Sequence, residues 1–153
     1  MAILAEPLDL PEGRLLALDL GQARIGVAVC DEAGLLASPL TVLKRLPTRA
    51  EDFAKIAALV RCENAVGVLV GLPRAGGAGS QDAVEGTQAR WTRRYAGRLA
   101  GALAVPVAFW DETLTSLDAA ELLREGGGKA GIDAAAAALI LAGYLETRRK
   151  KAR

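Results

Sequence analysis

Apolar residues follow two patterns along this chain, short continuous runs at first and helical spacing later. Apolar runs at Arg14–Leu20, Arg24–Cys30 and Leu35–Leu43 are separated by short polar turns, which is typical of antiparallel strands joined in a meander. The third run contains Ser38 and Pro39, and because proline has no N–H for a neighbouring strand, we expect this strand at an edge of the sheet. The N-terminal part of the chain therefore predicts a three-stranded meander that follows an arm over residues 1–13.

After the third strand, helical periodicity alternates with buried runs. The segment Thr48–Cys62 places Phe53, Ile56, Ala57 and Val60 at helical spacing, with Thr48 as its N-cap. The remaining expected elements are two strands and three helices, at Ala65–Val70, Asp82–Ala102, Val105–Trp110, Thr115–Arg124 and Asp133–Thr147. The order βββαβαβαα predicts an α/β fold, a mixed five-stranded sheet with helices on its faces.

The C-terminal part of the chain contains a glycine-rich segment, an acidic residue and a basic tail. We expect Gly126–Gly128 to act as a hinge that lets the region of Asp133 close over a substrate. Asp133 is expected to open the last helix, and the basic tail at residues 148–153 to fray.

The composition excludes several classes of catalytic and metal site but says less about the fold. The 153 residues are 52% hydrophobic and carry a net charge of +1, which predicts one folded domain over residues 1–153 and gives no hint of a nucleic-acid or membrane partner. Histidine is missing entirely, which excludes Ser-His-Asp and Cys-His hydrolases and histidine-ligated zinc. Cys30 and Cys62 are far apart and form no Cys-x-x-Cys motif. With no secretory signal and no apolar run long enough for a membrane span, we expect a cytoplasmic protein.

Three carboxylates are placed where parallel strands would bring them together. Asp19 closes the first strand, Glu112 follows the fifth, and Asp133 opens the last helix. Ligands of open α/β sheets bind at the carboxyl ends of the strands, so the three acids could share one site. Clustered carboxylates repel each other unless cations are present, and oxygen ligands suit Mg²⁺ or Mn²⁺. Two such ions can support phosphodiester hydrolysis without histidine.

Each acid also has an ordinary structural explanation. Asp133 could simply cap its helix, and Asp19, which lies before Gly21, could be a turn residue. Asp111 and Glu112 could be solvated loop carboxylates near a helix N-terminus. Spacing alone does not decide between these explanations and a metal site.

Four segments resemble the motifs of one family in the correct order. They are Leu18–Val29 with Ala37–Leu40, Val68–Pro73, Trp110–Ser116 and Ile132–Leu141, and they resemble the motifs of the YqgF (RuvX) family. The resemblance covers about residues 14–147. It implies an RNase H-like fold related to Holliday-junction resolvases, and a nuclease that matures the 5′ end of 16S rRNA. It also implies that Asp19, Glu112 and Asp133 are the catalytic, metal-binding acids.

The chain departs from the family pattern at three places. Thr113 stands where an arginine often follows the Asp-Glu pair, and Arg74–Gly79 lacks the usual Asn and Asp. The loop before the last acid is short and keeps only Lys129 as a cation. These departures affect positions expected to bind the substrate and leave the three acids unchanged.

Several cations could contact a nucleic-acid backbone. Arg24, Arg74 and Lys129 flank the expected site, and each could bind a phosphate or be an ordinary surface charge. Arg90 and Arg94 belong to a basic stripe on the Asp82–Ala102 helix, where a solvated face explains them at least as well. On the same helix, core packing or a partner contact explains Trp91 and Tyr95 better than base stacking.

The sequence therefore favours a metal-dependent nuclease on structured nucleic acid, with pre-16S rRNA maturation first among its roles. Holliday-junction resolution is the alternative enzyme function and requires a homodimer, whereas RNA processing fits a monomer or a homodimer. A non-catalytic nucleic-acid-binding regulator would keep the fold but would not need the acids. An actin-like ATPase also opens with a strand and Asp-x-Gly, but it closes two such domains around its nucleotide.

Overall fold

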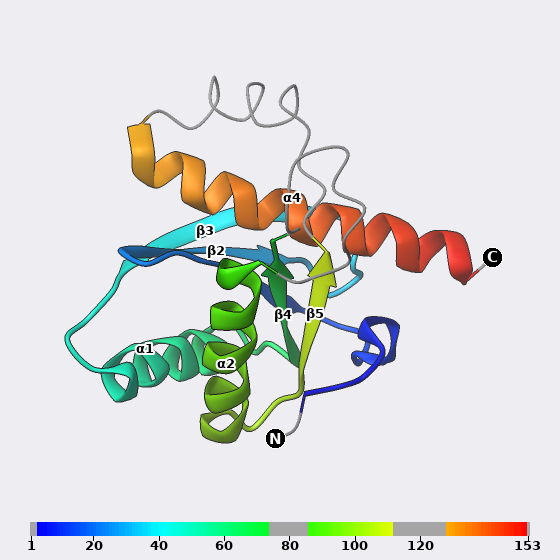
Figure 1. Cartoon of the computed structure of the whole chain (residues 1–153). Coiled ribbons are helices and arrows are strands. Elements are labelled where there is room, and N and C mark those ends of the chain that lie inside the picture. Colours follow the sequence, from blue (N-terminus) through cyan, green and yellow to red (C-terminus); the bar gives the residue numbers. More distant parts are fainter. Residues whose placement is uncertain (1–2, 74–85, 112–127, 153) are drawn as a thin grey trace.

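The computed structural model describes residues 3–73, 86–111 and 128–152, with the side chains of 128–130 left out of the description. Its five strands form one sheet in the order β3-β2-β1-β4-β5 (Figure 1). The strands are β1 (Leu15–Leu20), β2 (Arg24–Cys30), β3 (Ala37–Lys44), β4 (Gly67–Leu72) and β5 (Val107–Asp111). Arg74, Glu112 and the helix expected at Thr115–Arg124 lie outside the described residues.

The strand directions confirm the expected mixed sheet. β1 pairs antiparallel with β2, and β2 pairs antiparallel with β3, so the meander is present. β1 pairs in parallel with β4, and β4 in parallel with β5, as the two crossovers require. β3 is an edge strand, and its register against β2 shifts beside Pro39. The carboxyl ends of β1, β4 and β5 therefore meet at one edge.

Helices cover both faces of this sheet (Figure 1). Helices α1 (Arg49–Cys62) and α2 (Thr87–Ala102) cover one face, and α4 (Gly128–Lys151) crosses the other, mainly over β2 and β3. Side chains alternate along β1: Leu16 and Leu18 enter the core under α1 and α2, whereas Leu15 and Ala17 enter the core under α4.

One of two helix starts differs from the expectation. Thr48 caps α1 as expected, and Glu51 completes a capping box with it. The second helix begins at Thr87 rather than Asp82, because Gly86 has an extended backbone and serves as its N-cap.

The last helix corrects two expectations. It begins at Gly128, so Asp133 lies inside α4 and is not its N-cap; of the expected hinge, Gly128 is helical, and Gly126 and Gly127 lie outside the described residues. The segment expected to fray is helical to Lys151, and Arg149 donates to the carbonyl of Leu35 at 3.0 Å. The tail is thus tied to the body of the protein.

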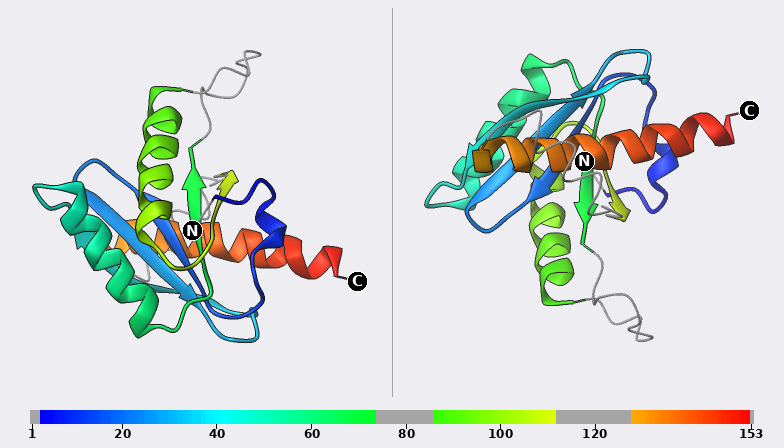
Figure 2. Two further views of the ribbon diagram at one scale, coloured as in Figure 1. Left: turned by 90° about the horizontal axis from the view of Figure 1, so that it is seen from below. Right: turned by 90° about the horizontal axis from the view of Figure 1, so that it is seen from above.

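The N-terminal arm packs on the sheet instead of extending from it. Ile3 forms a parallel bridge with Val107, beside β5 (Figure 2). A 3-10 helix follows at Pro7–Asp9, and Leu10 is fully buried. Within the described ranges, no helix is long and apolar enough to cross a membrane.

Candidate functional site

Asp19 lies on the face of the sheet that α4 covers. The alternation of β1 sends Leu15, Ala17 and therefore Asp19 toward this face, near the carboxyl end of the strand. Asp19 is partly exposed, and it pairs across the sheet with Gly26 of β2. Side chains of paired residues point to the same face, with Cβ atoms about 5 Å apart. Whatever packs on Gly26 is therefore an immediate neighbour of Asp19.

The backbone of Asp133 packs on Gly26. A Cβ atom added to Gly26 would overlap the carbonyl oxygen of Asp133 and come within 3.0 Å of the amide nitrogen of Ala134. Only glycine lets α4 come this close to the sheet. The structure thus brings Asp19 and Asp133, which are far apart in sequence, to the two sides of one glycine.

The side chain of Arg24 forms an ion pair with the carboxylate of Asp133. Its Nε atom donates to Oδ2 of Asp133 at 2.8 Å, and the two side chains are 42% and 26% exposed. The sequence leaves Arg24 open between a phosphate contact and a surface charge, and in this structure it forms an ion pair with one of the candidate acids. A guanidinium in this position reduces the repulsion between the two carboxylates.

The last described residue of β5 lies at the same edge of the sheet. Asp111 ends β5 and pairs with Leu72 at the end of β4, at the edge that carries Asp19. Glu112, the next residue in the sequence, lies outside the described residues. Among the described residues no three Asp, Glu, Cys or His side chains come together as a metal cluster. The donor set of Asp19 and Asp133 is nevertheless entirely carboxylate, which fits a hard divalent cation such as Mg²⁺ or Mn²⁺.

The other candidate cations are only partly placed. Arg90 and Arg94 are exposed in the first turns of α2, and α2 starts on the same side of the sheet as the carboxyl end of β4. Lys129 lies in the first turn of α4, but its side chain is not described, and Arg74 lies outside the described residues.

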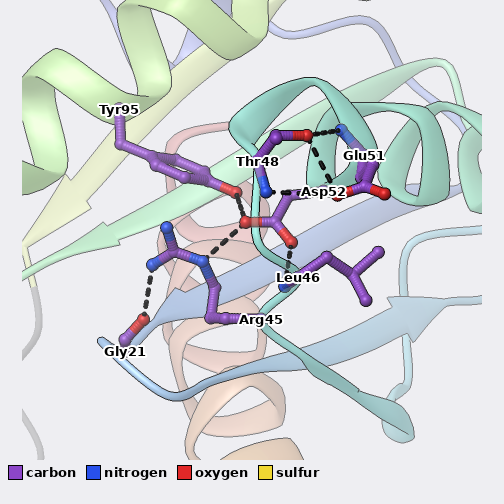
Figure 3. A network of polar contacts seen from close by, with 7 residues as sticks. All are labelled: Gly21, Arg45, Leu46, Thr48, Glu51, Asp52 and Tyr95. Carbon is purple, nitrogen blue, oxygen red and sulfur yellow. Dashed lines mark hydrogen bonds and ion pairs between the residues drawn. The ribbon is translucent and has the colours of Figure 1, made fainter.

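A buried polar network beside the site was missed by the sequence analysis (Figure 3). Its centre is Asp52, which is 3% exposed and accepts from Nε of Arg45 at 2.6 Å, from the amide of Leu46 at 2.8 Å and from the Tyr95 hydroxyl at 3.2 Å. Burial raises the pKa of Tyr95 strongly, and the neighbouring Asp52 charge adds to this effect. Asp52, Ile56 and Val60 are the buried residues of α1, and their four-residue spacing is the pattern that could have indicated an inward-facing acid.

The chain is similar to known proteins over most of its length. Residues 13–147 match the family model RuvX, described as Holliday junction resolvase. A protein of Syntrophus aciditrophicus named "Putative pre-16S rRNA nuclease" is 42% identical over 138 residues, covering 87% of this chain and 88% of the relative. A protein of Anaeromyxobacter sp. with the same name is 43% identical over 140 residues, covering 88% of this chain and 98% of the relative.

The similarity to solved structures concerns the fold. The structure of T. thermophilus RuvC in complex with Holliday junction substrate matches with a TM-score of 0.56 at 18% identity, covering 90% of this chain and 96% of that chain. The shared architecture confirms the RNase H-like fold that the motifs implied.

Proposed function

Because the chain belongs to the RuvX family, we propose that it is a nuclease that hydrolyses phosphodiester bonds in structured nucleic acid, and that its substrate is the 5′ end of pre-16S rRNA. The name shared by relatives that are more than 40% identical over nearly the whole chain supports this substrate. A role in processing ribosomal RNA also implies a cytoplasmic location.

The packing of Asp133 against Gly26, the direct neighbour of Asp19, carries this proposal. If Asp19 were only a turn residue and Asp133 only a helix cap, nothing would require the two to be neighbours. Asp133 is not a helix cap in this structure. We assign Asp19 and Asp133 as catalytic, metal-binding acids, and Glu112 joins them by its match to the family motif. Arg24, Arg74 and Lys129 are proposed to contact phosphates, with Arg90 and Arg94 as outlying contacts.

The acids would hold Mg²⁺ or Mn²⁺, most simply as a pair of ions. Such cations activate water and stabilise the leaving oxygen of a phosphodiester. The chain has no histidine whose imidazole could do this in their place. The backbone of Asp19 is held by its pairing with β2. Asp133 is held by α4, and Arg24 neutralises it until a cation or a phosphate competes for one of the two partners.

Holliday-junction resolution is the second candidate function. The description of the matching family model and the RuvC-like fold favour it. It would require a homodimer that presents two sites to symmetric strands.

A substrate panel separates the two functions. Purified protein is incubated with a pre-16S rRNA carrying its 5′ extension, with an unstructured single-stranded RNA and with a four-way DNA junction, in Mg²⁺, in Mn²⁺ or in excess chelator. We expect cleavage of the ribosomal precursor only with a divalent cation. Preferential cleavage of the junction would favour the second function, and full activity in chelator would contradict both.

A further inference from the structure

The turn between β1 and β2 carries residues of the proposed site on both sides. Asp19 comes two residues before Gly21, and Arg24 ends the turn and binds Asp133. The turn is tight, because the Gly21 amide donates to the carbonyl of Arg24 at 2.9 Å and a Cβ atom on Gly21 would lie 2.7 Å from that same oxygen. A shift of this turn would therefore move two groups of the site together.

Arg45 holds this turn at two points. Its backbone N–H donates to the carbonyl of Ala23 at 2.9 Å. Its guanidinium Nη1 donates to the carbonyl of Gly21 at 3.1 Å (Figure 3). The residue that follows β3 thus clamps the first and the last residue of the segment that links Leu20 to Arg24.

The guanidinium of Arg45 is itself fixed in place. Nε donates to the buried carboxylate of Asp52 at 2.6 Å, and the Arg45 side chain is only 18% exposed. Its Cζ atom lies 5.4 Å from the ring centroid of Trp91 and 4.9 Å from that of Tyr95, within cation–π range. Charge-assisted hydrogen bonds and ring contacts of this kind leave the side chain one conformation. The two core helices α1 and α2 therefore determine where the turn lies.

We propose that Arg45 is a positioning residue of the nuclease site, which sets the β1–β2 turn and with it the carboxylate of Asp19 and the guanidinium of Arg24. This inference rests on the proposed function. Arg45 acts on the site through its hydrogen bond to the Gly21 carbonyl. Its effect is expected mainly in the turnover number, since misplacing a catalytic group by about 1 Å can lower the rate on the order of a hundredfold, and to a smaller extent in substrate binding through Arg24.

Lysine is the informative replacement at this position. A guanidinium presents a planar fork that reaches Asp52 and Gly21 at once, whereas a single ammonium cannot reproduce both contacts. Arg45→Lys keeps the positive charge beside the buried Asp52, so the variant avoids the cost of an unpaired buried carboxylate. The variant therefore removes the side-chain hold on the turn, keeps the backbone hydrogen bond to Ala23 and leaves the protein folded.

Arg14→Lys provides the matched control. Arg14 also forms a partly buried ion pair, with Glu63 at 2.5 Å, but it lies at the start of β1, at the opposite edge of the sheet. Both variants are compared with the wild-type protein by melting temperature, by steady-state cleavage of the ribosomal precursor in Mn²⁺, and by hydrogen exchange of the Gly21 amide without metal.

We expect Arg45→Lys to lower kcat at least tenfold, to raise KM by a smaller factor and to speed exchange at Gly21, while Arg14→Lys changes none of these quantities. Wild-type kcat and Gly21 exchange in Arg45→Lys would overturn the inference, as would an equal loss of kcat in Arg14→Lys. If the wild-type protein cleaves nothing, the proposed function fails, and the exchange data still decide whether Arg45 holds the turn.

Discussion

At the scale of single residues, the charge of Arg24 links the two proposed tasks of the site, holding cations and holding phosphates. Its ion pair with Asp133 is partly exposed and contributes at most about 1 kcal/mol to stability after solvent screening. The sequence indicated that Arg24 lies beside the acids, but its pairing with Asp133 depends on a contact between β2 and α4 that no local pattern encodes. A residue of this kind affects binding more than folding.

Arg24→Gln should therefore weaken nucleic-acid binding without unfolding the protein. We expect the slope of log affinity against log salt concentration to fall by roughly one unit, as for the loss of one phosphate contact. The slope is measured by a salt titration of binding in chelator, with Arg14→Gln as the control at the far edge of the sheet. An unchanged slope, or equal losses in both variants, would assign Arg24 to structure alone.

At the scale of elements, the contact between β2 and α4 builds the site, and it depends on the missing side chain of Gly26. The sequence pattern predicted most strands within two residues and the capped start of α1, since alternation and capping are local properties. It did not predict that α4 begins at Gly128, because a glycine-rich segment has a low intrinsic helix propensity.

Gly26→Ala should push α4 away from the sheet. The added methyl group meets the backbone of Asp133, which cannot rotate aside as a side chain can, so we expect the free energy of unfolding to fall by about 2 kcal/mol. The cleavage rate should fall by more than the loss of folded protein accounts for, because Asp19 and Asp133 move apart. Chemical denaturation and cleavage rates measure both effects.

Gly97→Ala is the matched control for this change. Gly97 lies within α2, and a Cβ atom there would meet nothing within 4 Å, so the substitution should raise the free energy of unfolding by about 0.5–1 kcal/mol and leave cleavage intact. Equal stability of the two variants would contradict the close approach of α4 to β2.

At the scale of the whole molecule, two separate cores meet at the sheet, and each contains one of the two tyrosines. Tyr95 is buried between the sheet and α2, and Tyr144 is buried under α4. Helical spacing suggested that Tyr95 belongs to the core, and this interpretation is confirmed. The Arg45–Asp52–Tyr95 network could not be predicted, because it joins three elements whose mutual placement exists only in the folded chain.

The tyrosines offer a pH test of this two-sided packing. Burial raises the pKa of both hydroxyls above the ordinary value of 10.0, so the folded state favours the neutral phenols. The resulting stability is complete below pH 10 and is lost as the pH rises through the folded pKa values. We expect no phenolate absorbance near pH 10 until helical circular dichroism is lost, whereas the chain in denaturant titrates normally. A phenolate signal near pH 10 with helicity unchanged would show that one face is open.

The most direct measurement for the whole proposal is the rate of pre-16S rRNA cleavage as a function of Mn²⁺ concentration, for wild type and Asp19→Asn. Asparagine is nearly the same size and suits the strand end, but it lacks the charge that holds a cation. We expect the melting temperature without metal to be kept or raised, and the rate to fall on the order of a hundredfold or more, since such cations supply several kcal/mol of transition-state stabilisation. Asp9→Asn, which changes an exposed acid of the N-terminal segment, should cleave like wild type. Wild-type cleavage by folded Asp19→Asn at every Mn²⁺ concentration would contradict the assignment of Asp19 to the site.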